Sequence, residues 1–576
     1  MVAVKTKTKN KPETMLPPSL QPIAGGMQGF VETLKARGFE GEADISEETL
    51  EFYSHDASLF ELKPQMVVYP KNTKDLQRLV TSAYFSRHQI PDLSLTARSA
   101  GTCMSGGAIN DSVIIDFTHH FKKIESVSQT SARVQPGVLY REFEKATLSK
   151  GALMPAFPAS RDLAAVGGMV ANFAGGEKSL QYGKIDNFVK KLQVVLSDGM
   201  VYKLKALDKK ELAAKKAQKN FEGEIYQQMF ELLDKNYDKI KAAKPKVSKN
   251  STGYNLWDVW DRETGVFDLT KLFIGSQGTL GLVSDIEFKL IKKQPHSGVL
   301  VCFMKNEKKL GELINTVLAT KPASFEAFDN YTLMLAIKFF PYFRKTLGWG
   351  GLIKLGFQLI PDGLLLLRGI PKMVLLIEYT GETAGEVKEK VHSMRQTLEP
   401  FNLEAMEEDE TEAKAWKFRI MRRESFNLLR NKVKDKHTAP FIDDFVVPPP
   451  HLPEFLPKLR KIVKKYNLMA TLAGHMGDGN YHVIPLMNIE DPRERAKLEP
   501  AMKEVNELVL RYGGSISGEH NDGMIRGPWL EAMYGKEIVK LFKETKKIFD
   551  PHNIFNPHKK TDADWDFSMS HIRQHF

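Results

Sequence analysis

Cysteine is scarce in this chain of 576 residues, which holds only Cys103 and Cys302. The two lie far apart and form no CxxC motif, so no disulfide framework is expected and a reducing compartment is favoured. An iron–sulfur cluster needs about four thiolates, which excludes a cluster held by this chain alone. Any electrons that the protein collects must therefore pass to another molecule.

Long hydrophobic runs and targeting signals are lacking as well. Residues 2–11 are lysine-rich and polar, without the apolar stretch of a secretory signal. No uncharged apolar run reaches the roughly 18 residues that a membrane-spanning helix needs. We expect residues 1–50 to form a basic tail followed by helices, and the protein to be cytoplasmic.

The net charge of +11 comes without a recognisable nucleic-acid-binding motif. There is no zinc-finger spacing, no aromatic-and-basic RNA-binding signature and no heptad zipper, so a nucleic-acid partner is not expected. The excess charge favours an anionic substrate or an acidic membrane surface. The length exceeds what one hydrophobic core supports, which predicts two or three domains.

The sequence contains three loops that are rich in small residues. The first, residues 98–107, comes after a strand at 66–69, a helix capped by Thr73 and a strand at 93–96. Backbone N–H groups in such a loop can cradle a phosphate, although an ordinary Gly/Ser turn is the alternative. It is neither a Walker A loop nor a GxGxxG motif, so a nicotinamide-binding domain is not supported.

The second and third loops span residues 155–183 and 275–283. Their density of Gly, Ala and Pro is costly in conformational entropy. That cost makes sense where the backbone must lie against a large flat group.

Histidines and a carboxylate gather in two later segments. If Gly477 to Asn480 form a four-residue hairpin loop, His475 pairs with His482 and their Cβ atoms lie roughly 5 Å apart. The segment 518–523 adds Glu519 and His520. His475, His482 and Glu519 make a two-histidine, one-carboxylate metal set with open positions. The alternative is that both hairpin histidines are structural.

These loops, in this order, resemble a known family when taken with residues 474–482, 518–526 and Asn556-Pro557-His558-Lys559. The resemblance is to the FAD-binding vanillyl-alcohol-oxidase superfamily, with a PCMH-type FAD domain, and within it to the D-lactate, glycolate and D-2-hydroxyglutarate dehydrogenases. It covers nearly the whole chain from about residue 50. It implies an α+β fold with a two-subdomain FAD-binding domain at 51–295, an α+β cap at 296–515 and a C-terminal segment, 516–576, that completes the flavin site.

The resemblance also implies where FAD binds. Residues 98–107 would hold the pyrophosphate, and since this loop has no histidine, non-covalent FAD is expected. Ser99 and Ala100 stand where the family usually has glycines, and Gln277 where it usually has Glu. The implied cofactor residues are Arg98, Ser99, Ala100, Gly101, Thr102, Cys103, Ser105, Gly106, Pro155, Ser160, Gly167, Gly168, Asn172, Gly175, Gly176, Tyr182, Gly183, Gly278, Gly281, Val283 and Asn556.

For the chemistry, the resemblance assigns the metal, usually zinc with Mn²⁺ or Fe²⁺ as alternatives, to the two-histidine, one-carboxylate set. It assigns His520 the role of base and Arg419 that of binding the substrate carboxylate, which a guanidinium can grip bidentately. Ile442 stands where the hydroxyglutarate enzymes have a lysine. This departure tells against a grip on a second substrate carboxylate and favours a D-lactate-like monoacid, with D-2-hydroxyglutarate and glycolate as the alternative substrates.

The cap contains an unusual insert, residues 331–372, which combines many apolar side chains with basic ones and the single acid Asp362. Apolar helices with basic flanks suit the plane of an anionic membrane. We expect the insert to dock the protein on the inner face of the cell membrane, where quinone can accept electrons. A buried helical pair or a homodimer contact is the alternative.

The sequence therefore predicts an FAD- and metal-dependent D-2-hydroxy-acid dehydrogenase that passes electrons to quinone or another external acceptor. Two alternatives remain: a relative of alkyl-glycerone-phosphate synthase, which uses the same flavin fold without net oxidation, and a flavin-binding membrane-associated subunit without activity.

Overall fold

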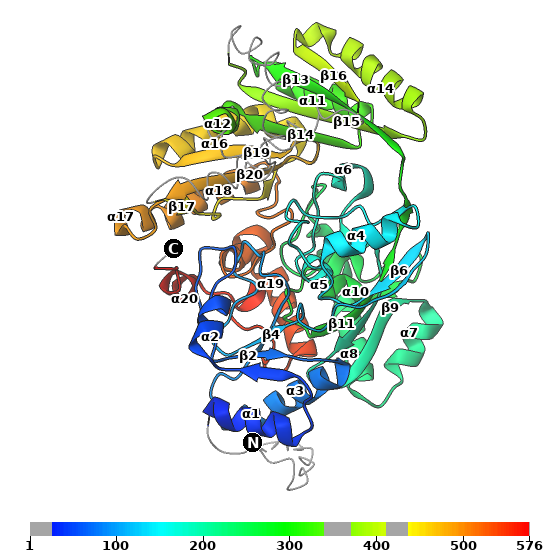
Figure 1. Cartoon of the computed structure of the whole chain (residues 1–576), viewed down its shortest axis with the longest axis vertical. Coiled ribbons are helices and arrows are strands. Elements are labelled where there is room, and N and C mark those ends of the chain that lie inside the picture. Colours follow the sequence, from blue (N-terminus) through cyan, green and yellow to red (C-terminus); the bar gives the residue numbers. More distant parts are fainter. Residues whose placement is uncertain (1–25, 339–369, 410–435, 575–576) are drawn as a thin grey trace, which may run out of the picture.

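The computed structural model describes residues 26–338, 370–409 and 436–574. These residues form an α+β protein with two parts, as expected (Figure 1). We call residues 26–292 with residues 516–574 the base, which is the lower part of Figure 1. The described residues of 293–515 are the cap, the upper part. Residues 339–369 of the predicted insert, and Arg419, lie outside the described residues.

The first sheet of the base has the strand order β1-β2-β4-β3, with β4 parallel to both β2 and β3. Helix α3 begins after Asn72, whose side chain accepts a hydrogen bond from the N–H of Asp75. The N-cap residue of this helix is therefore Asn72, one residue before the predicted Thr73. This region consists of α1 (Gly26–Ala36), β1 (Glu42–Asp44), α2 (Glu47–Tyr53), β2 (Met66–Tyr69), α3 (Thr73–Ser86), β3 (Leu95–Arg98) and β4 (Val113–Asp116).

The second sheet of the base is antiparallel, in the order β10-β9-β8-β11-β6-β5. Its strands are β5 (Ile124–Val127), β6 (Ser131–Val134), β8 (Val189–Val195), β9 (Val201–Leu207), β10 (Phe267–Asp268) and β11 (Leu282–Lys289). A separate pair joins β7 (Ala152–Leu153) to β12 (Ile291–Lys292). The helices here are α4 (Tyr140–Leu148), α5 (Val166–Ala171), α6 (Ser179–Tyr182), α7 (Lys209–Lys216), α8 (Phe221–Lys235), α9 (Tyr237–Ala242) and α10 (Thr270–Phe273).

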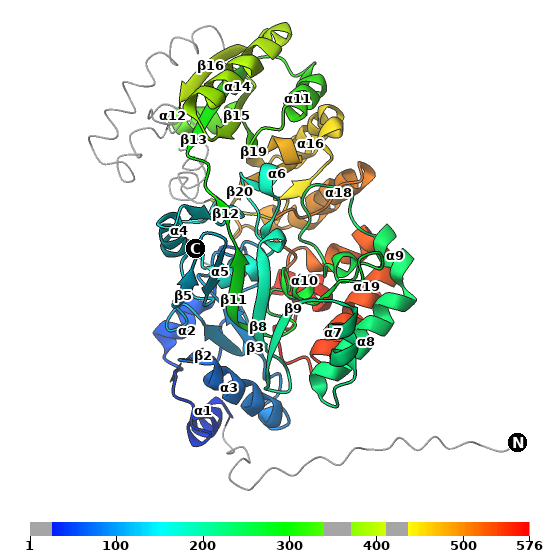
Figure 2. The ribbon, with the colours of Figure 1, turned by 90° about the vertical axis from the view of Figure 1, so that its right-hand side faces the viewer.

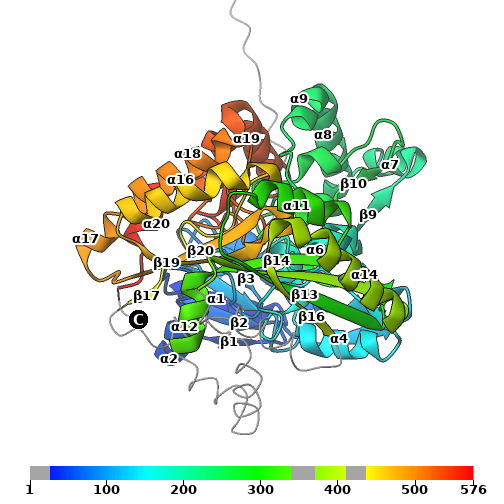
Figure 3. The same cartoon turned by 90° about the horizontal axis from the view of Figure 1, so that it is seen from above.

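The cap is built on one antiparallel sheet in the order β16-β13-β15-β14-β19-β20-β17, with β18 paired to β20. Seen from above, α16, α11 and α14 follow one another along the sheet (Figure 3). The strands are β13 (His296–Met304), β14 (Ser324–Asp329), β15 (Met373–Gly381), β16 (Glu404–Asp409), β17 (His437–Thr438), β18 (Phe445–Val446), β19 (Met469–His475) and β20 (Asn480–Met487). The helices are α11 (Leu310–Ala319), α12 (Asn330–Lys338), α14 (Ala384–Thr397), α16 (Leu452–Lys465), α17 (Pro492–Arg495) and α18 (Leu498–Arg511).

After the cap the chain returns to the base through α19 (Leu530–Phe549) and α20 (Trp565–Ser570). Helix α19 packs beside α8 (Figure 2). Residues 554–556 then run next to β3, where the N–H of Leu95 donates to the carbonyl of Ile554 and the N–H of Asn556 donates to the carbonyl of Leu95. Residues 554–556 thereby lie along β3, the edge strand of the first sheet, which leads into the first small-residue loop.

The hairpin of β19 and β20 differs from the predicted register. His475 pairs with Asn480 and His482 pairs with Ala473, so the two histidines are diagonal rather than opposed. The turn is the 3₁₀ helix η7 (Met476–Asp478) followed by Gly479, at φ 68°. Diagonal neighbours share a face of the sheet. The rings therefore still meet, with centroids 5.6 Å apart.

Among the described residues, no helix combines the length and the apolar character needed to cross a membrane.

Candidate active site

The three small-residue loops converge on the side chain of Gln277. Its Nε2 donates to Oγ of Ser105 in the first loop, at 3.1 Å, and to Oδ1 of Asn172 in the second, at 3.3 Å. Its Oε1 accepts from the N–H of Gly523, at 2.8 Å. The side-chain amide of Gln277 thus connects these loops, which are predicted to surround the flavin, with the segment that carries Glu519 and His520.

Asn556 is the second junction between these loops. Its Nδ2 donates to the carbonyls of Gly107 and Gln277, at 2.9 and 2.6 Å, and its Oδ1 accepts from the hydroxyl of Thr96. The side chain is fully buried. The oxygen and the NH₂ group of the Asn556 amide are both hydrogen-bonded within the protein, so this side chain holds the loops in place.

Small side chains keep the loops close to one another. A Cβ on Gly168 would lie 3.2 Å from the side chain of Ser99, and one on Gly278 would lie 3.5 Å from that of Ala97. Ser99 and Ala100 therefore occupy a region where backbone, rather than long side chains, forms the surface. This is the character expected of a surface that lies against a dinucleotide.

Arg98 has a structural role in this conformation. Its guanidinium donates to the carbonyls of His55 and Tyr53, at 2.9 and 3.3 Å, and lies over the Tyr53 ring. Any hold of this segment on a phosphate would therefore come from residues 99–107 and not from the Arg98 side chain.

Lys559 supports a bound anion at this place. The side chain is 1% exposed, and its one hydrogen bond within the described residues is a long contact, 3.4 Å, to the carbonyl of Pro557. Burial lowers the pKa of Lys559 to about 8, although Asp111 and Asp56 oppose the shift. A diphosphate beside Cys103 would stabilise this buried cation. The residues present therefore fit FAD.

The other implied cofactor residues lie in several different surroundings. Gly175 and Gly176 border the histidine site, since a Cβ on Gly175 would lie 3.3 Å from Oε1 of Glu519. Tyr182 instead lies near Thr380 of the cap, and Val283 packs on the core of the base. At Gly167, Gly183 and Gly281 a Cβ would clash with Pro136, Asn187 and the carbonyl of Val195, respectively, so only glycine fits at these positions. Pro155 and Ser160 lie in the segment between β7 and α5.

The predicted metal set is brought together. Ligand atoms of His475, His482 and Glu519 all lie within 4.8 Å of one another, and Nε2 of His475 is 3.4 Å from Oε1 of Glu519. His475 and Glu519 are buried, and His482 is half-buried. Two imidazoles and a carboxylate at this spacing suit zinc, manganese or iron.

Carboxylates outside the set orient each histidine. Nδ1 of His475 lies 2.7 Å from Oε1 of Glu326 on β14, and Nδ1 of His482 lies 3.0 Å from Oδ1 of Asp443. With Nδ1 engaged in this way, Nε2 of each ring is left for the site. Burial lowers the pKa of His475, but the carboxylates of Glu326 and Glu519 together outweigh burial, so the pKa is raised.

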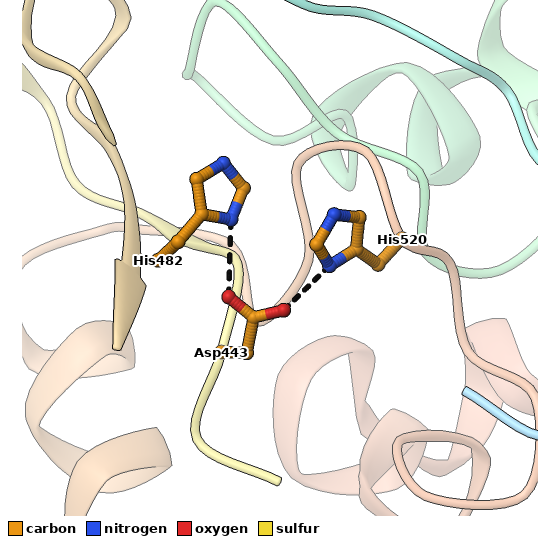
Figure 4. A group of neighbouring side chains, drawn as sticks. All are labelled: Asp443, His482 and His520. Carbon is orange, nitrogen blue, oxygen red and sulfur yellow. Dashed lines mark hydrogen bonds and ion pairs between the residues drawn. The ribbon is translucent and has the colours of Figure 1, made fainter. Parts of the chain in front are cut away.

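His520 shares the carboxylate of Asp443 with His482. Its Nδ1 lies 2.6 Å from Oδ2 of Asp443, and its ring stacks on that of His482 with centroids 5.0 Å apart (Figure 4). Burial lowers the pKa of His520, but Asp443 and Asp444 more than offset this and raise it to about 9.

Asp444 fixes the backbone that presents Glu519 and His520. Its carboxylate accepts from the N–H groups of both residues and from the hydroxyl of Ser517. Asp444 is fully buried and has φ 71°, and its carboxylate contacts backbone N–H groups, whereas that of Asp443 contacts the imidazole rings. Neither aspartate was predicted from the sequence to have a role, and only Ile442 of this segment entered the prediction of the substrate.

Lys249 is the other residue that the sequence analysis missed. Its fully buried Nζ lies 2.5 Å from Oε1 of Glu519 and 3.1 Å from Oδ2 of Asp478. Burial raises the pKa of Glu519, but Lys249 and His475 outweigh it and hold the pKa well below its usual range. The sequence signal was weak, because Lys249 is one lysine in a polar segment.

Two protein-family models match this chain. Residues 64–205 match the model of the FAD binding domain, and residues 293–560 match that of the C-terminal domain of FAD linked oxidases. The chain belongs to the FAD-linked oxidases with a PCMH-type FAD-binding fold, as the resemblance implied.

Curated relatives agree with this assignment. The chain is 29% identical over 540 residues to D-2-hydroxyglutarate dehydrogenase of Pseudomonas putida, covering 92% of this chain and 51% of the relative. It is 27% identical over 515 residues to glycolate oxidase subunit GlcD of Bacillus subtilis, covering 88% and 91%. The chain thus spans about half the length of the D-2-hydroxyglutarate dehydrogenase.

Solved structures show the same fold at low identity. The p-cresol methylhydroxylase structure superposes with a TM-score of 0.64 at 14% identity, over 94% of this chain and 97% of that one. An alkyldihydroxyacetonephosphate synthase gives a TM-score of 0.62 at 15% identity, over 92% and 85%.

Proposed function

We propose that this chain is an FAD- and divalent-metal-dependent dehydrogenase that oxidises a D-2-hydroxy acid to the 2-keto acid. The observation that carries the proposal is the convergence of His475, His482 and Glu519 with His520 at the edge of the three loops. Matches to a D-2-hydroxyglutarate dehydrogenase and to a glycolate oxidase subunit support the substrate class.

The chain's own residues divide the work. A bound FAD supplies the hydride acceptor at N5, and a bound divalent ion supplies a Lewis acid for the hydroxyl and carboxylate. His475, His482 and Glu519 would hold the ion, and Nε2 of His520 would accept the hydroxyl proton. The positive charge of a divalent ion held by these ligands would favour the neutral ring that a base needs, opposing the effect of Asp443 and Asp444 on the pKa of His520.

A D-lactate-like monoacid is the favoured substrate, with D-2-hydroxyglutarate and glycolate as the alternatives. Ile442 is 3% exposed and packs in the core of the cap. An apolar side chain at this position offers no grip on a second carboxylate. We assign the first carboxylate to Arg419, on the family resemblance.

Variants of the histidines test the assignment. His475→Ala is expected to lose the ion, as measured by metal analysis of the purified protein, because the set falls to two ligands. His520→Ala is expected to keep metal and flavin but to lose flavin reduction. His451→Ala, an exposed histidine on the cap, is the control. Normal flavin reduction in His520→Ala would refute the base role.

Electrons would leave to quinone or another external acceptor, with the protein peripheral on the inner membrane face. At the described edges of the insert, Tyr331, Met334 and Ile370 are 60%, 44% and 51% exposed, which supports a surface contact. A vesicle flotation assay tests the proposed contact with the membrane. Deleting residues 339–367 should release the protein, and unchanged flotation would contradict it. If instead the deletion turned a dimer into a monomer, the homodimer alternative would replace the membrane contact.

A further inference from the structure

One carboxylate serves two histidines in this site. Asp443 is 2% exposed and offers a different oxygen to each ring: Oδ1 to Nδ1 of His482, at 3.0 Å, and Oδ2 to Nδ1 of His520, at 2.6 Å (Figure 4). The two rings stand nearly parallel, at 25°. The same residue therefore contacts a proposed metal ligand and the proposed base.

The sharing fixes both rings in the same way. A carboxylate accepts hydrogen bonds, so each imidazole carries its proton on Nδ1 and presents Nε2 elsewhere. For His482 this leaves Nε2 within the metal set. For His520 it leaves Nε2 as the nitrogen that can take a proton from a substrate.

Neighbouring residues hold Asp443 in place. The guanidinium of Arg526, which is 1% exposed, donates to the carbonyl of Asp443 at 2.8 Å. Asp444, the next residue, holds the N–H of His520 at 2.7 Å. The carboxylate and the ring that it orients are therefore tied to one another through backbone as well as side chain.

We propose that Asp443 is a positioning residue that sets the tautomers of His482 and His520 together, and so links metal binding to proton acceptance. The inference rests on the proposed function. Glu326 supplies a contrast, because the histidine that it orients, His475, is a proposed metal ligand and not the proposed base. Loss of the Glu326 carboxylate should weaken metal binding alone, whereas loss of the Asp443 carboxylate should weaken both metal binding and proton acceptance by His520.

Asp443→Asn separates the two roles. The amide has one acceptor and one donor group, so it can accept from only one of the two rings. A metal on Nε2 of His482 keeps the proton of that ring on Nδ1, which takes the amide oxygen. The amide NH₂ then faces His520 and drives its proton to Nε2, where it blocks proton acceptance.

A second arrangement uses the same atoms. Asp443, His482 and His520 also lie within metal-binding distance of one another. Were this the metal set, Asp443 would be a ligand, and Asp443→Asn would lose the ion at every metal concentration.

The test compares Asp443→Asn with Glu326→Gln in the FAD-loaded protein. Chelator competition measures zinc affinity, and anaerobic mixing with D-lactate at saturating zinc measures flavin reduction. Both variants should bind zinc about 10–100-fold more weakly. At saturating zinc, reduction should fall about 10²–10⁴-fold in Asp443→Asn and less than tenfold in Glu326→Gln. Reduction in Asp443→Asn within threefold of wild type, or zinc that no concentration restores, overturns the inference.

Nitrogen-15 spectra of histidine-labelled, zinc-loaded protein give a readout without substrate, with His520 assigned from His520→Ala. The neutral ring of His520 should carry its proton on Nδ1 in the wild type and on Nε2 in Asp443→Asn. An Nε2–H tautomer in the wild type overturns the inference even if the variant fails to fold. If no 2-hydroxy acid reduces the flavin while the tautomers behave as expected, the proposed function fails and the positioning role stands.

Discussion

The ammonium of Lys249 lies 2.5 Å from Oε1 of Glu519, and both side chains are buried beneath the histidine hairpin. The same Nζ is 3.1 Å from Oδ2 of Asp478. One lysine thus balances two buried carboxylates, one of which belongs to the proposed metal set.

Lys249→Met should destabilise the metal-free protein by about 3–5 kcal/mol, because it leaves buried carboxylates without a cation. A bound divalent ion replaces part of that charge at Glu519. The rise in Tm on adding zinc should therefore be larger in the variant than in the wild type. Thermal unfolding with chelator and with zinc measures this. Lys244→Met, which removes an exposed bridge to Asp258, is the control and should change stability by less than about 1 kcal/mol. An equal zinc effect in Lys249→Met and wild type would count against a metal at Glu519.

Gly479→Ala should disturb the hairpin that carries both histidines. Gly479 has φ 68°, and a Cβ there would lie 1.8 Å from the carbonyl of Val447. Gly513 has φ 67° with nothing near its Cβ position, so Gly513→Ala carries the backbone strain alone, about 1–2 kcal/mol. Gly479→Ala should lose more free energy of unfolding in urea, and more zinc affinity, than Gly513→Ala. Equal losses in the two variants would mean that the contact with Val447 does not shape the turn.

The buried pair of Lys560 and Asp522 should stabilise the protein only as a pair. Their charged atoms are 2.6 Å apart with both side chains fully buried, and burial lowers the pKa of Lys560. Lys560→Met leaves Asp522 unpaired and should cost about 3–5 kcal/mol by urea unfolding. The double variant with Asp522→Asn should recover part of that loss. The exposed Lys547→Met should be nearly neutral. A double variant less stable than Lys560→Met would contradict this account.

Cys302 should resist thiol reagents near neutral pH. Burial in the core of the cap raises its pKa to about 12, which keeps the unreactive thiol form dominant at pH 8. Native protein should therefore release at most one equivalent of thionitrobenzoate from a disulfide reagent at pH 8, and two after denaturation. Cys302→Ala should leave the native value unchanged. Two fast equivalents from native protein would show that the core of the cap opens.

Much of the site could be predicted from residue order, since the glycine loops, the two hairpin histidines and Glu519 are each marked by local composition. The register of the hairpin formed by β19 and β20 could not be predicted in this way. Whether His475 faces His482 or Asn480 depends on the turn, where Gly479 packs against Val447 from another segment. The close approach of the two histidines was predicted correctly, because a shift of two residues keeps side chains on the same face.

Residues that act through burial escaped the sequence analysis. Lys249 reaches Glu519 across 270 positions, and Asp443 reaches His520 across 77. Nothing local marks either as part of a site. Arg98 shows the converse, because a position that fits a family pattern can point its side chain at the carbonyls of its own domain.

We propose that this chain oxidises a D-2-hydroxy acid at a flavin bound near His520. The decisive measurement is anaerobic stopped-flow mixing of the FAD- and zinc-loaded protein with a panel of D- and L-2-hydroxy acids. We expect the visible absorbance of the flavin to bleach with D-lactate, faster than with D-2-hydroxyglutarate or glycolate, and to stay unchanged with L-lactate. Flavin that remains oxidised with every D-2-hydroxy acid would contradict it.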